Sequence, residues 1–151
     1  MSDSSTTEQQ NADREAERRR YQRERSSKEQ EKREAEAAKA AIEQKIERLQ
    51  EAYSKIHAVK RNAEDLNSGV QRQGDSMPLW VGQRFGAYSN YVDSDFKSYY
   101  TTYISDLDYV QDEINREISR LQIQAAEYGN IIDRLWARIC QLGRWIQNLF
   151  N

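Results

Sequence analysis

The sequence is poor in the residues that end helices or build small reactive sites. Its 151 residues include one proline, six glycines, one cysteine and one histidine. The single cysteine, Cys140, excludes an intramolecular disulfide, and the single histidine, His57, has no second ligand at metal spacing beside it. So few turn residues argue against a β-rich fold and favour long helices, and we therefore expect an all-α protein.

Long apolar runs are also missing. No stretch of about 18 apolar residues could span a bilayer, and the N-terminal MSDSSTTEQQ lacks the basic and then apolar pattern of a secretory signal. The 23 basic and 25 acidic residues give a formal net charge of −2. Without a strong charge of one sign we expect no nucleic-acid partner, and we place the protein in the cytoplasm.

The motifs of common catalytic sites are absent too. The sequence has no nucleotide-binding glycine loop, no H-E-x-x-H and no Ser-His-Asp set around His57. Acidic pairs such as Asp106 with Asp108 point to different faces of a helix. We therefore expect a protein that is not an enzyme, without catalytic, cofactor-binding or metal-binding residues.

The N-terminal part of the sequence is rich in charged residues. We predict that residues 1–39 form a charged N-terminal extension, disordered to partly helical, because they offer almost nothing apolar to bury. Pairs such as Glu15 with Arg19 stabilise a helix by only about 0.2–0.5 kcal/mol each. Glutamates interleave with the arginines of RRRYQRER, which favours a solvated helix face over a nucleic-acid site.

Residues 40–151 form the predicted domain, an elongated antiparallel helical hairpin with a long second helix and an elbow at 74–82. Gly74 suits a helix end, and Pro78 suits the first turn of the next helix, where its missing N–H costs nothing. Trp80 then lies beside Gly82, where the lack of a Cβ lets another backbone approach. The predicted hairpin-turn motif is Pro78, Trp80 and Gly82.

Apolar residues recur at spacings of three and four on both sides of the elbow, which predicts one apolar stripe on each helix. The first stripe comprises Ile42, Ile46, Leu49, Tyr53, Ile56, Val59, Ala63, Leu66 and Val70. The second comprises Phe85, Tyr88, Val92, Phe96, Tyr99, Tyr103, Leu107, Val110, Ile114 and Ile118. Tyr91 and Tyr100 lie beside it, and either widen it into a second contact surface or edge a simple two-helix core.

The second stripe continues to the C-terminus and creates a packing problem. A hairpin folded about Met77 places residue i opposite about residue 154 − i, because both helices rise equally. Residues after Leu121 would then face the charged stretch before Arg33. Either the chain folds back near Gly129, or another polypeptide covers this face. The predicted partner-binding residues are Leu121, Tyr128, Ile132, Leu135, Trp136, Ile139, Leu142, Trp145, Ile146 and Leu149.

The order of these features resembles a known family. From about Lys39 onwards, LWVG, YVDSDFKSYYTTYISDLDYVQDEINREISRL, GNIID and the terminal IQNLFN are similar to the small WXG-like helical proteins encoded beside LXG-domain toxins of the Gram-positive type VII secretion system. The resemblance implies a hairpin that binds the helical N-terminal domain of such a toxin, as a targeting factor or chaperone. A second small helical partner and the secretion ATPase are further partners that it implies.

The same resemblance bears on export. WXG-type substrates carry a Y-x-x-x-D/E signal, and this chain offers two copies inside its second helix, Tyr91 to Asp95 and Tyr109 to Glu113. The family signal usually follows the hairpin, so both copies depart from the family position. If either copy acts, the protein leaves the cell with its toxin.

Two other functions fit the same sequence. In the first, two copies cover each other's C-terminal stripes and form a self-associating structural coiled coil, a homo-oligomer. In the second, the segment from Ile131 to Phe150 attaches to a membrane surface, with arginines flanking Trp136 and Trp145.

Overall fold

The protein folds as two long helices in a computed structural model, which describes residues 2–75, 86 and 89–151. The helix α1 spans Ser2–Asp75, a π-helical segment η1 spans Tyr91–Phe96, and α3 spans Lys97–Asn148. No strand occurs in the described ranges. The predicted all-α helical hairpin is confirmed. The predicted turn motif of Pro78, Trp80 and Gly82 lies outside the described residues.

Strong helix formers account for the unusual length of α1. Its charged N-terminal part is rich in alanine, glutamate and arginine, which have high helix propensity. Ion pairs along the helix surface add to this, such as Arg25 with Glu29 at 3.2 Å and Lys32 with Glu36 at 3.1 Å. We expected residues 1–39 to be disordered to partly helical, and α1 runs through them from Ser2.

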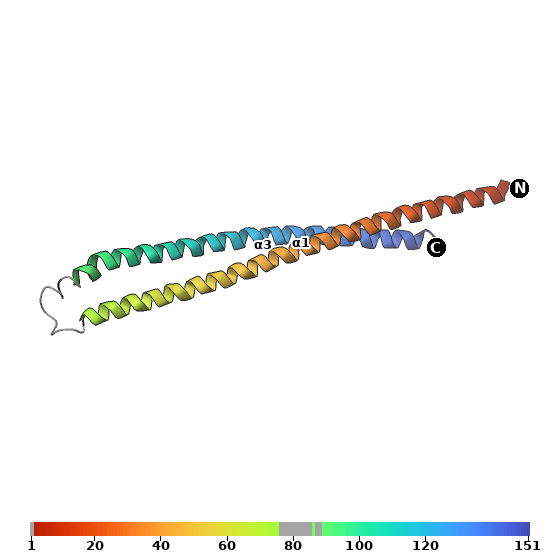
Figure 1. The fold of residues 1–151 in the computed structure, drawn as a ribbon. Coiled ribbons are helices and arrows are strands. Elements are labelled where there is room, and N and C mark those ends of the chain that lie inside the picture. The colour runs from red at the N-terminus through yellow and green to blue at the C-terminus, as the bar shows by residue number, and fades with distance from the viewer. Residues whose placement is uncertain (1, 76–85, 87–88) are drawn as a thin grey trace. The chain divides into compact units, whose positions relative to one another are not determined.

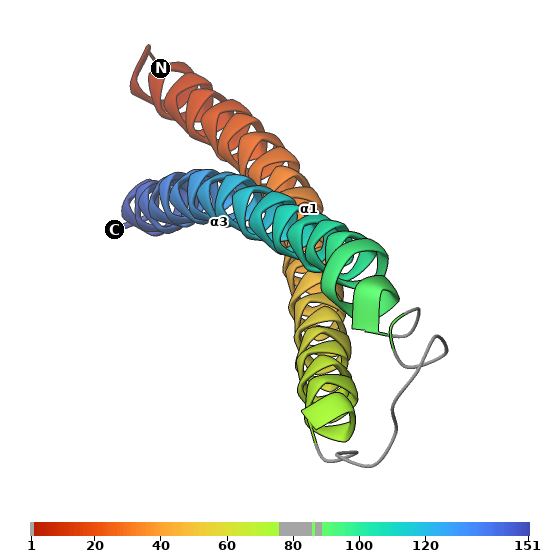
Figure 2. The same ribbon diagram turned by 90° about the vertical axis from the view of Figure 1, so that its left-hand side faces the viewer.

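Contacts divide the chain into two units, and each unit contains part of both helices. Unit 1 combines residues 1–44 with residues 121–151, and unit 2 consists of residues 45–120. Within each unit, α1 and α3 run in opposite directions (Figure 1). Figure 2 views the same helices from the end where α1 stops and η1 begins. Each unit is therefore an antiparallel helix pair, and we describe the two separately.

The apolar core lies in unit 1. Six apolar residues are buried there, and Leu142 is fully enclosed. The core residues are Ala35, Ile42, Leu121, Ala125, Ile139 and Leu142. They sit at spacings of three, four and seven along their helices, as expected for an antiparallel coiled-coil pair.

The register between the helices differs from the expected one in both units. A pivot at Met77 would place Trp145 opposite Gln9, whereas Trp145 contacts Tyr21. In unit 2, Lys60 is paired with Asp108, fourteen residues beyond the position that the same pivot predicts. The predicted register is therefore wrong. The reason is that the observed pairs require a pivot later in the chain than Met77.

The inward faces of unit 2 agree with the predicted stripes only in part. On α1 the predicted members Ile46, Leu49, Tyr53, Ile56, Ala63 and Val70 are half-buried. Val59 and Leu66 are instead 44% and 69% exposed, and the polar residues Lys60 and Asn67 beside them are half-buried. On α3, the predicted stripe members Tyr99, Tyr103 and Val110 are exposed. The half-buried or buried residues of α3 in unit 2 are Tyr100, Ile104, Leu107, Asp108, Gln111, Ile114, Glu117 and Ile118.

This error has a physical cause. The predicted stripes include apolar residues only, and therefore leave out the polar residues that occupy inward positions. In unit 2, neighbouring residues such as Leu66 and Asn67 both satisfy spacings of three and four, and the apolar member faces outwards. Each helix of unit 2 therefore carries apolar residues on two faces.

Candidate partner-binding surface

The ten C-terminal residues predicted to bind a partner lie in unit 1, and nine of them are buried or half-buried. Leu121, Ile139 and Leu142 are 3%, 4% and 0% exposed. Trp136, at 56%, is the exposed member. The remaining six are half-buried: Tyr128, Ile132, Leu135, Trp145, Ile146 and Leu149.

The charged part of α1 covers this stripe, contrary to our expectation that it has nothing to offer. Arg138 donates a hydrogen bond from Nε to Glu24 at 2.8 Å and forms an ion pair with the same carboxylate at 2.7 Å, and its guanidinium lies 4.8 Å from the centroid of the Trp145 ring. The Tyr21 ring packs against that of Trp145, with ring centroids 5.4 Å apart. Long arginine and lysine side chains bury their aliphatic stems along apolar surface while their charges stay in water.

Two exposed aromatic rings of unit 1 form cation–π contacts with basic side chains of α1. The Lys32 ammonium lies 4.9 Å from the centre of the Trp136 ring, and the Arg18 guanidinium lies 5.5 Å from that of Phe150. Each contact at an exposed site is worth only about 0.5–1 kcal/mol. The exposed aromatic residues of unit 1 therefore already have contacts within the chain.

The interior of unit 2 contains polar as well as apolar side chains. Gln111 is only 7% exposed, and among the described residues its side-chain Nε2 has no hydrogen-bond partner; nor has the buried Oδ1 of Asn67. Lys60 forms an ion pair with Asp108, and this hydrogen bond raises the pKa of Lys60 above its ordinary value of 10.5. Desolvation raises the pKa of Tyr100. Polar groups at inward positions weaken a helix pair unless they are paired.

The apolar residues of unit 2 are displaced to its surface. Val59, Leu66, Tyr99, Tyr103 and Val110 each come one position before an inward-facing residue of their helix. A residue one position before an inward-facing residue lies about 100° around the α-helix from it. Because the two helices are antiparallel, such residues of α1 and of α3 lie on the same side of the helix pair. We call these five residues the apolar flank.

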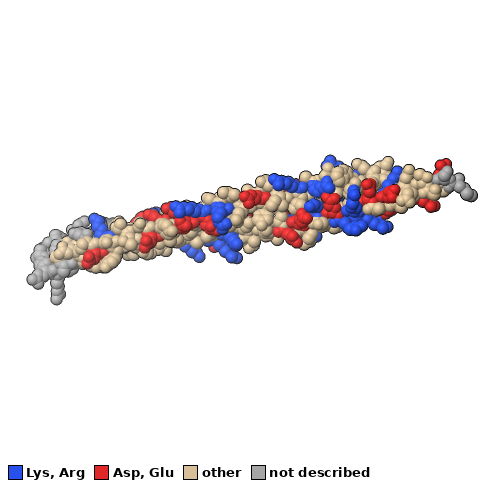
Figure 3. Space-filling model, turned by 90° about the horizontal axis from the view of Figure 1, so that it is seen from above, with Lys and Arg blue, Asp and Glu red and all other residues tan. Residues whose placement is uncertain are grey.

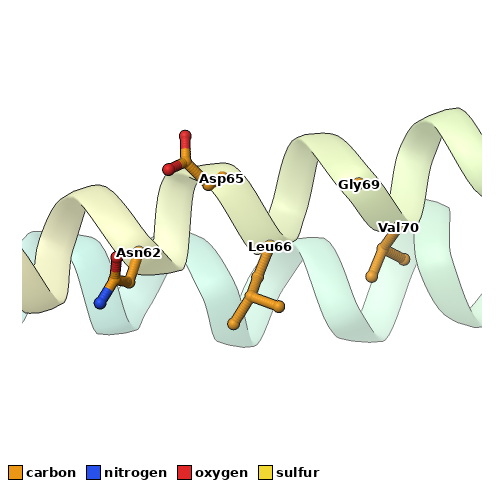
Figure 4. A pocket seen from close by; sticks show the side chains of 5 residues that line it. All are labelled: Asn62, Asp65, Leu66, Gly69 and Val70. Carbon is orange, nitrogen blue, oxygen red and sulfur yellow. The ribbon is translucent and has the colours of Figure 1, made fainter.

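One part of the flank has the form of a coiled-coil socket. A shallow depression on α1 is lined by Val70 together with Asn62, Asp65, Leu66 and Gly69. Figure 4 shows Asn62, Leu66 and Val70 on one side of the helix, with the Asp65 carboxylate on the other. Residues spaced i, i+3, i+4 and i+7, as the last four are, form the hole that receives one side chain of a facing helix. We call these four residues the socket.

Both candidate export motifs are accessible. Tyr91 and Tyr109 are 49% and 65% exposed, and Asp95 and Glu113 are exposed as well. Tyr91 begins η1, where its ring lies 6.2 Å from that of Phe96. Glu113 is bonded to a base on its own helix, Arg116, at 2.5 Å. Both motifs lie in unit 2, and Tyr109 points away from the apolar flank, because it is two positions before Gln111.

Other site types find little support among the described residues. On the face drawn in Figure 3, Lys and Arg are intermixed with Asp and Glu and form no patch of one sign. The described part of the chain has no group of three His, Cys, Asp or Glu side chains that could hold a metal ion. Within the same residues, no helix is long and apolar enough to cross a membrane. Cys140 is a free, exposed thiol.

A comparison with protein families supplies the remaining finding. A YwqH-like family model matches residues 23–143, which is most of the chain. The chain belongs to the YwqH-like family. The matched range includes the whole of unit 2, the apolar flank and the socket. The family is not known as enzymatic. No curated protein and no solved structure matches the chain.

Proposed function

We propose that this YwqH-like protein is a non-enzymatic binding partner of an LXG-domain toxin, and that it acts as a targeting factor or chaperone in type VII secretion. YwqH-like proteins are associated with LXG toxin systems, which supports this assignment. The observation that carries it is the apolar flank. Five large apolar side chains stand exposed on one side of a helix pair that encloses the polar side chain of Gln111.

The exposed side chains of the apolar flank favour a partner that covers them. Covering a large apolar side chain removes it from water and contributes about 1.5–3 kcal/mol when the burial is complete. Helices that carry apolar residues at a third position of each heptad belong in bundles of more than two helices. Helices from the toxin domain would supply the missing members and complete a bundle with unit 2.

Co-expression tests the proposal. The chain is produced alone and together with the LXG domain encoded beside its gene, and the masses of the purified species are measured by light scattering. We expect a hetero-complex that survives size-exclusion chromatography. A stable homo-oligomer that ignores the LXG domain would contradict the proposal and favour a self-associating coiled coil.

The ten C-terminal residues remain a prediction for partner binding, and Trp136 is the most accessible of them. Substituting Trp136 with alanine tests that surface, because an exposed side chain can be removed with little effect on the fold. An unchanged affinity for the LXG domain would restrict the partner surface to unit 2.

We further propose that the protein is made in the cytoplasm and exported with its toxin. The exposure of Tyr91, Asp95, Tyr109 and Glu113 supports a role for either motif in recognition by the secretion machinery. Asp95→Ala and Glu113→Ala variants are assayed for the appearance of protein and toxin in the medium. Normal export of both variants would contradict the assignment.

A further inference from the structure

We infer that the socket on α1 receives one large apolar side chain from an amphipathic partner helix, which lies along the apolar flank and carries a basic residue at its edge beside α3. This inference rests on the proposed function and specifies the surface and the chemistry of its partner. The residues that carry it are the socket members Asn62, Asp65, Leu66 and Gly69.

The shape of the socket favours a bulky side chain. Gly69 supplies no Cβ, and an added Cβ there would meet no atom within 4 Å among the described residues. A glycine inside a long helix costs about 0.5–1 kcal/mol relative to alanine. At this position it leaves room for another helix to approach α1 closely. A leucine or aromatic side chain of a facing helix would fill the space beside Leu66.

The position of the socket favours a helix that contacts both α1 and α3. Leu66 belongs to the apolar flank together with Tyr99 and Tyr103 of α3. A helix placed between these residues has apolar surface on both sides. It must carry its own apolar residues at spacings of three and four to meet the flank, whose members lie seven residues apart on α1 and four and then seven residues apart on α3.

Charge sets the chemistry of the partner's edge beside α3. Asp106 follows Tyr103 by three residues, so that it lies on the same side of α3. It forms no ion pair among the described residues. On α1, the carboxylate of Asp65 lies on the other side of the helix from Leu66 (Figure 4). A helix with lysine or arginine beside its apolar stripe would complement Asp106.

The decisive variant fills the socket without disturbing the free protein. Gly69→Leu places a side chain in the space reserved for the partner, and the helix itself tolerates leucine better than glycine. We expect the melting temperature of the free chain to stay the same or to rise. The affinity for the LXG domain, measured by calorimetry on full-length protein, should fall about 30-fold or more.

Two matched pairs of variants locate the contact. Tyr103→Asp alters a residue of the flank, whereas Tyr109→Asp alters the same residue type on the same helix at a more exposed position outside the flank. Asp106→Lys borders the flank, and Asp112→Lys is a control with the same change of charge. We expect Tyr103→Asp to weaken binding about 30-fold and Asp106→Lys to slow association about tenfold. Both controls should bind like the wild type.

Each contrary result has a distinct meaning. If the wild type forms no complex with the LXG domain, the proposed function fails and this inference fails with it. If the complex forms and Gly69→Leu and Tyr103→Asp bind normally, the socket assignment alone is overturned. Equal losses for Tyr103→Asp and Tyr109→Asp would also overturn it. A free-chain dimer that Gly69→Leu dissociates would identify a second copy as the occupant, against the inference.

Discussion

The two units of this protein differ in how far the same two helices bury their apolar residues. Unit 1 buries six apolar side chains in its interior. In unit 2 the buried residue among those described is Gln111; apolar residues such as Ile104, Leu107 and Ile114 are only half-buried, and the five residues of the apolar flank are exposed. The comparison shows that total apolar content does not decide how well a helix pair is packed. What decides it is which heptad positions the apolar residues occupy.

Identical substitutions in the two units should therefore have very different effects, and this is the largest difference that we expect. Leu142→Ala removes a fully enclosed side chain from unit 1 and should lower the free energy of unfolding by about 2–5 kcal/mol. Leu66→Ala in unit 2 removes a side chain that is 69% exposed and should change it by less than about 0.5 kcal/mol. Urea unfolding followed by circular dichroism measures both.

The pair of leucine variants also bears on the fold assignment itself. If Leu66→Ala were as destabilising as Leu142→Ala, Leu66 would be part of a core, and the apolar flank would not exist as a free surface. A small effect of Leu142→Ala would equally contradict the packing of unit 1.

The second prediction removes a buried polar group from unit 2. Gln111→Leu replaces a buried side chain whose amide nitrogen has no partner among the described residues, and it adds an apolar group at an inward position. We expect the free energy of unfolding to rise by about 1–2 kcal/mol, because the desolvation penalty of the unpaired donor disappears. Gln50→Leu is the matched control at an exposed position of the same unit, and it should have little effect.

If Gln111→Leu is neutral or destabilising, Gln111 must gain a hydrogen bond that compensates for its burial. A polar residue at one inward position can also fix the register of a coiled coil. A change in the disulfide cross-linking pattern between cysteines introduced at positions 60 and 108 would then reveal a slipped register in the leucine variant.

The hairpin and its helical class follow from sequence because they depend on composition and on the spacing of apolar residues, both of which are local. The inward faces of unit 2 do not, because Val59 with Lys60, and Leu66 with Asn67, fit the same spacing equally well. Only the partner helix decides between them. A signal was nevertheless present, since the third apolar position in each heptad indicates a second face.

The cover over the C-terminal stripe was missed for another reason. The arginines and lysines of residues 1–39 carry charge, but their aliphatic stems can also cover apolar surface, and Ala35 is buried in the core. An error in register added to this, because a pivot at Met77 assigned Trp145 to Gln9 when its observed neighbour is Tyr21. The length of an elbow cannot be deduced from apolar periodicity on either side of it.

The third prediction concerns the polar cover of unit 1. Glu24 and Arg138 form a hydrogen bond at 2.8 Å and an ion pair at 2.7 Å, with side chains that are 33% and 35% exposed. A double-mutant cycle with Glu24→Gln and Arg138→Gln should give a coupling energy of about 0.5–1 kcal/mol, as expected for partly solvated ion pairs. A coupling energy near zero would mean that Arg138 acts through its contact with Trp145 instead.

The smallest expected effect is a pH dependence in unit 2. Arg120 donates a hydrogen bond from Nε to Glu117 at 2.9 Å, and this bond lowers the pKa of Glu117 below its ordinary value of 4.5. A carboxyl whose pKa is lower in the folded state stabilises the fold above its unfolded pKa, and that stabilisation is lost as the pH falls through the folded pKa. The urea midpoint of wild type should therefore exceed that of Glu117→Gln at pH 7, and the gap should close at pH 3. Both side chains are substantially exposed, so 1 M NaCl should also narrow the gap at pH 7. A gap that persists in acid would show that Glu117 acts through packing and not through its charge.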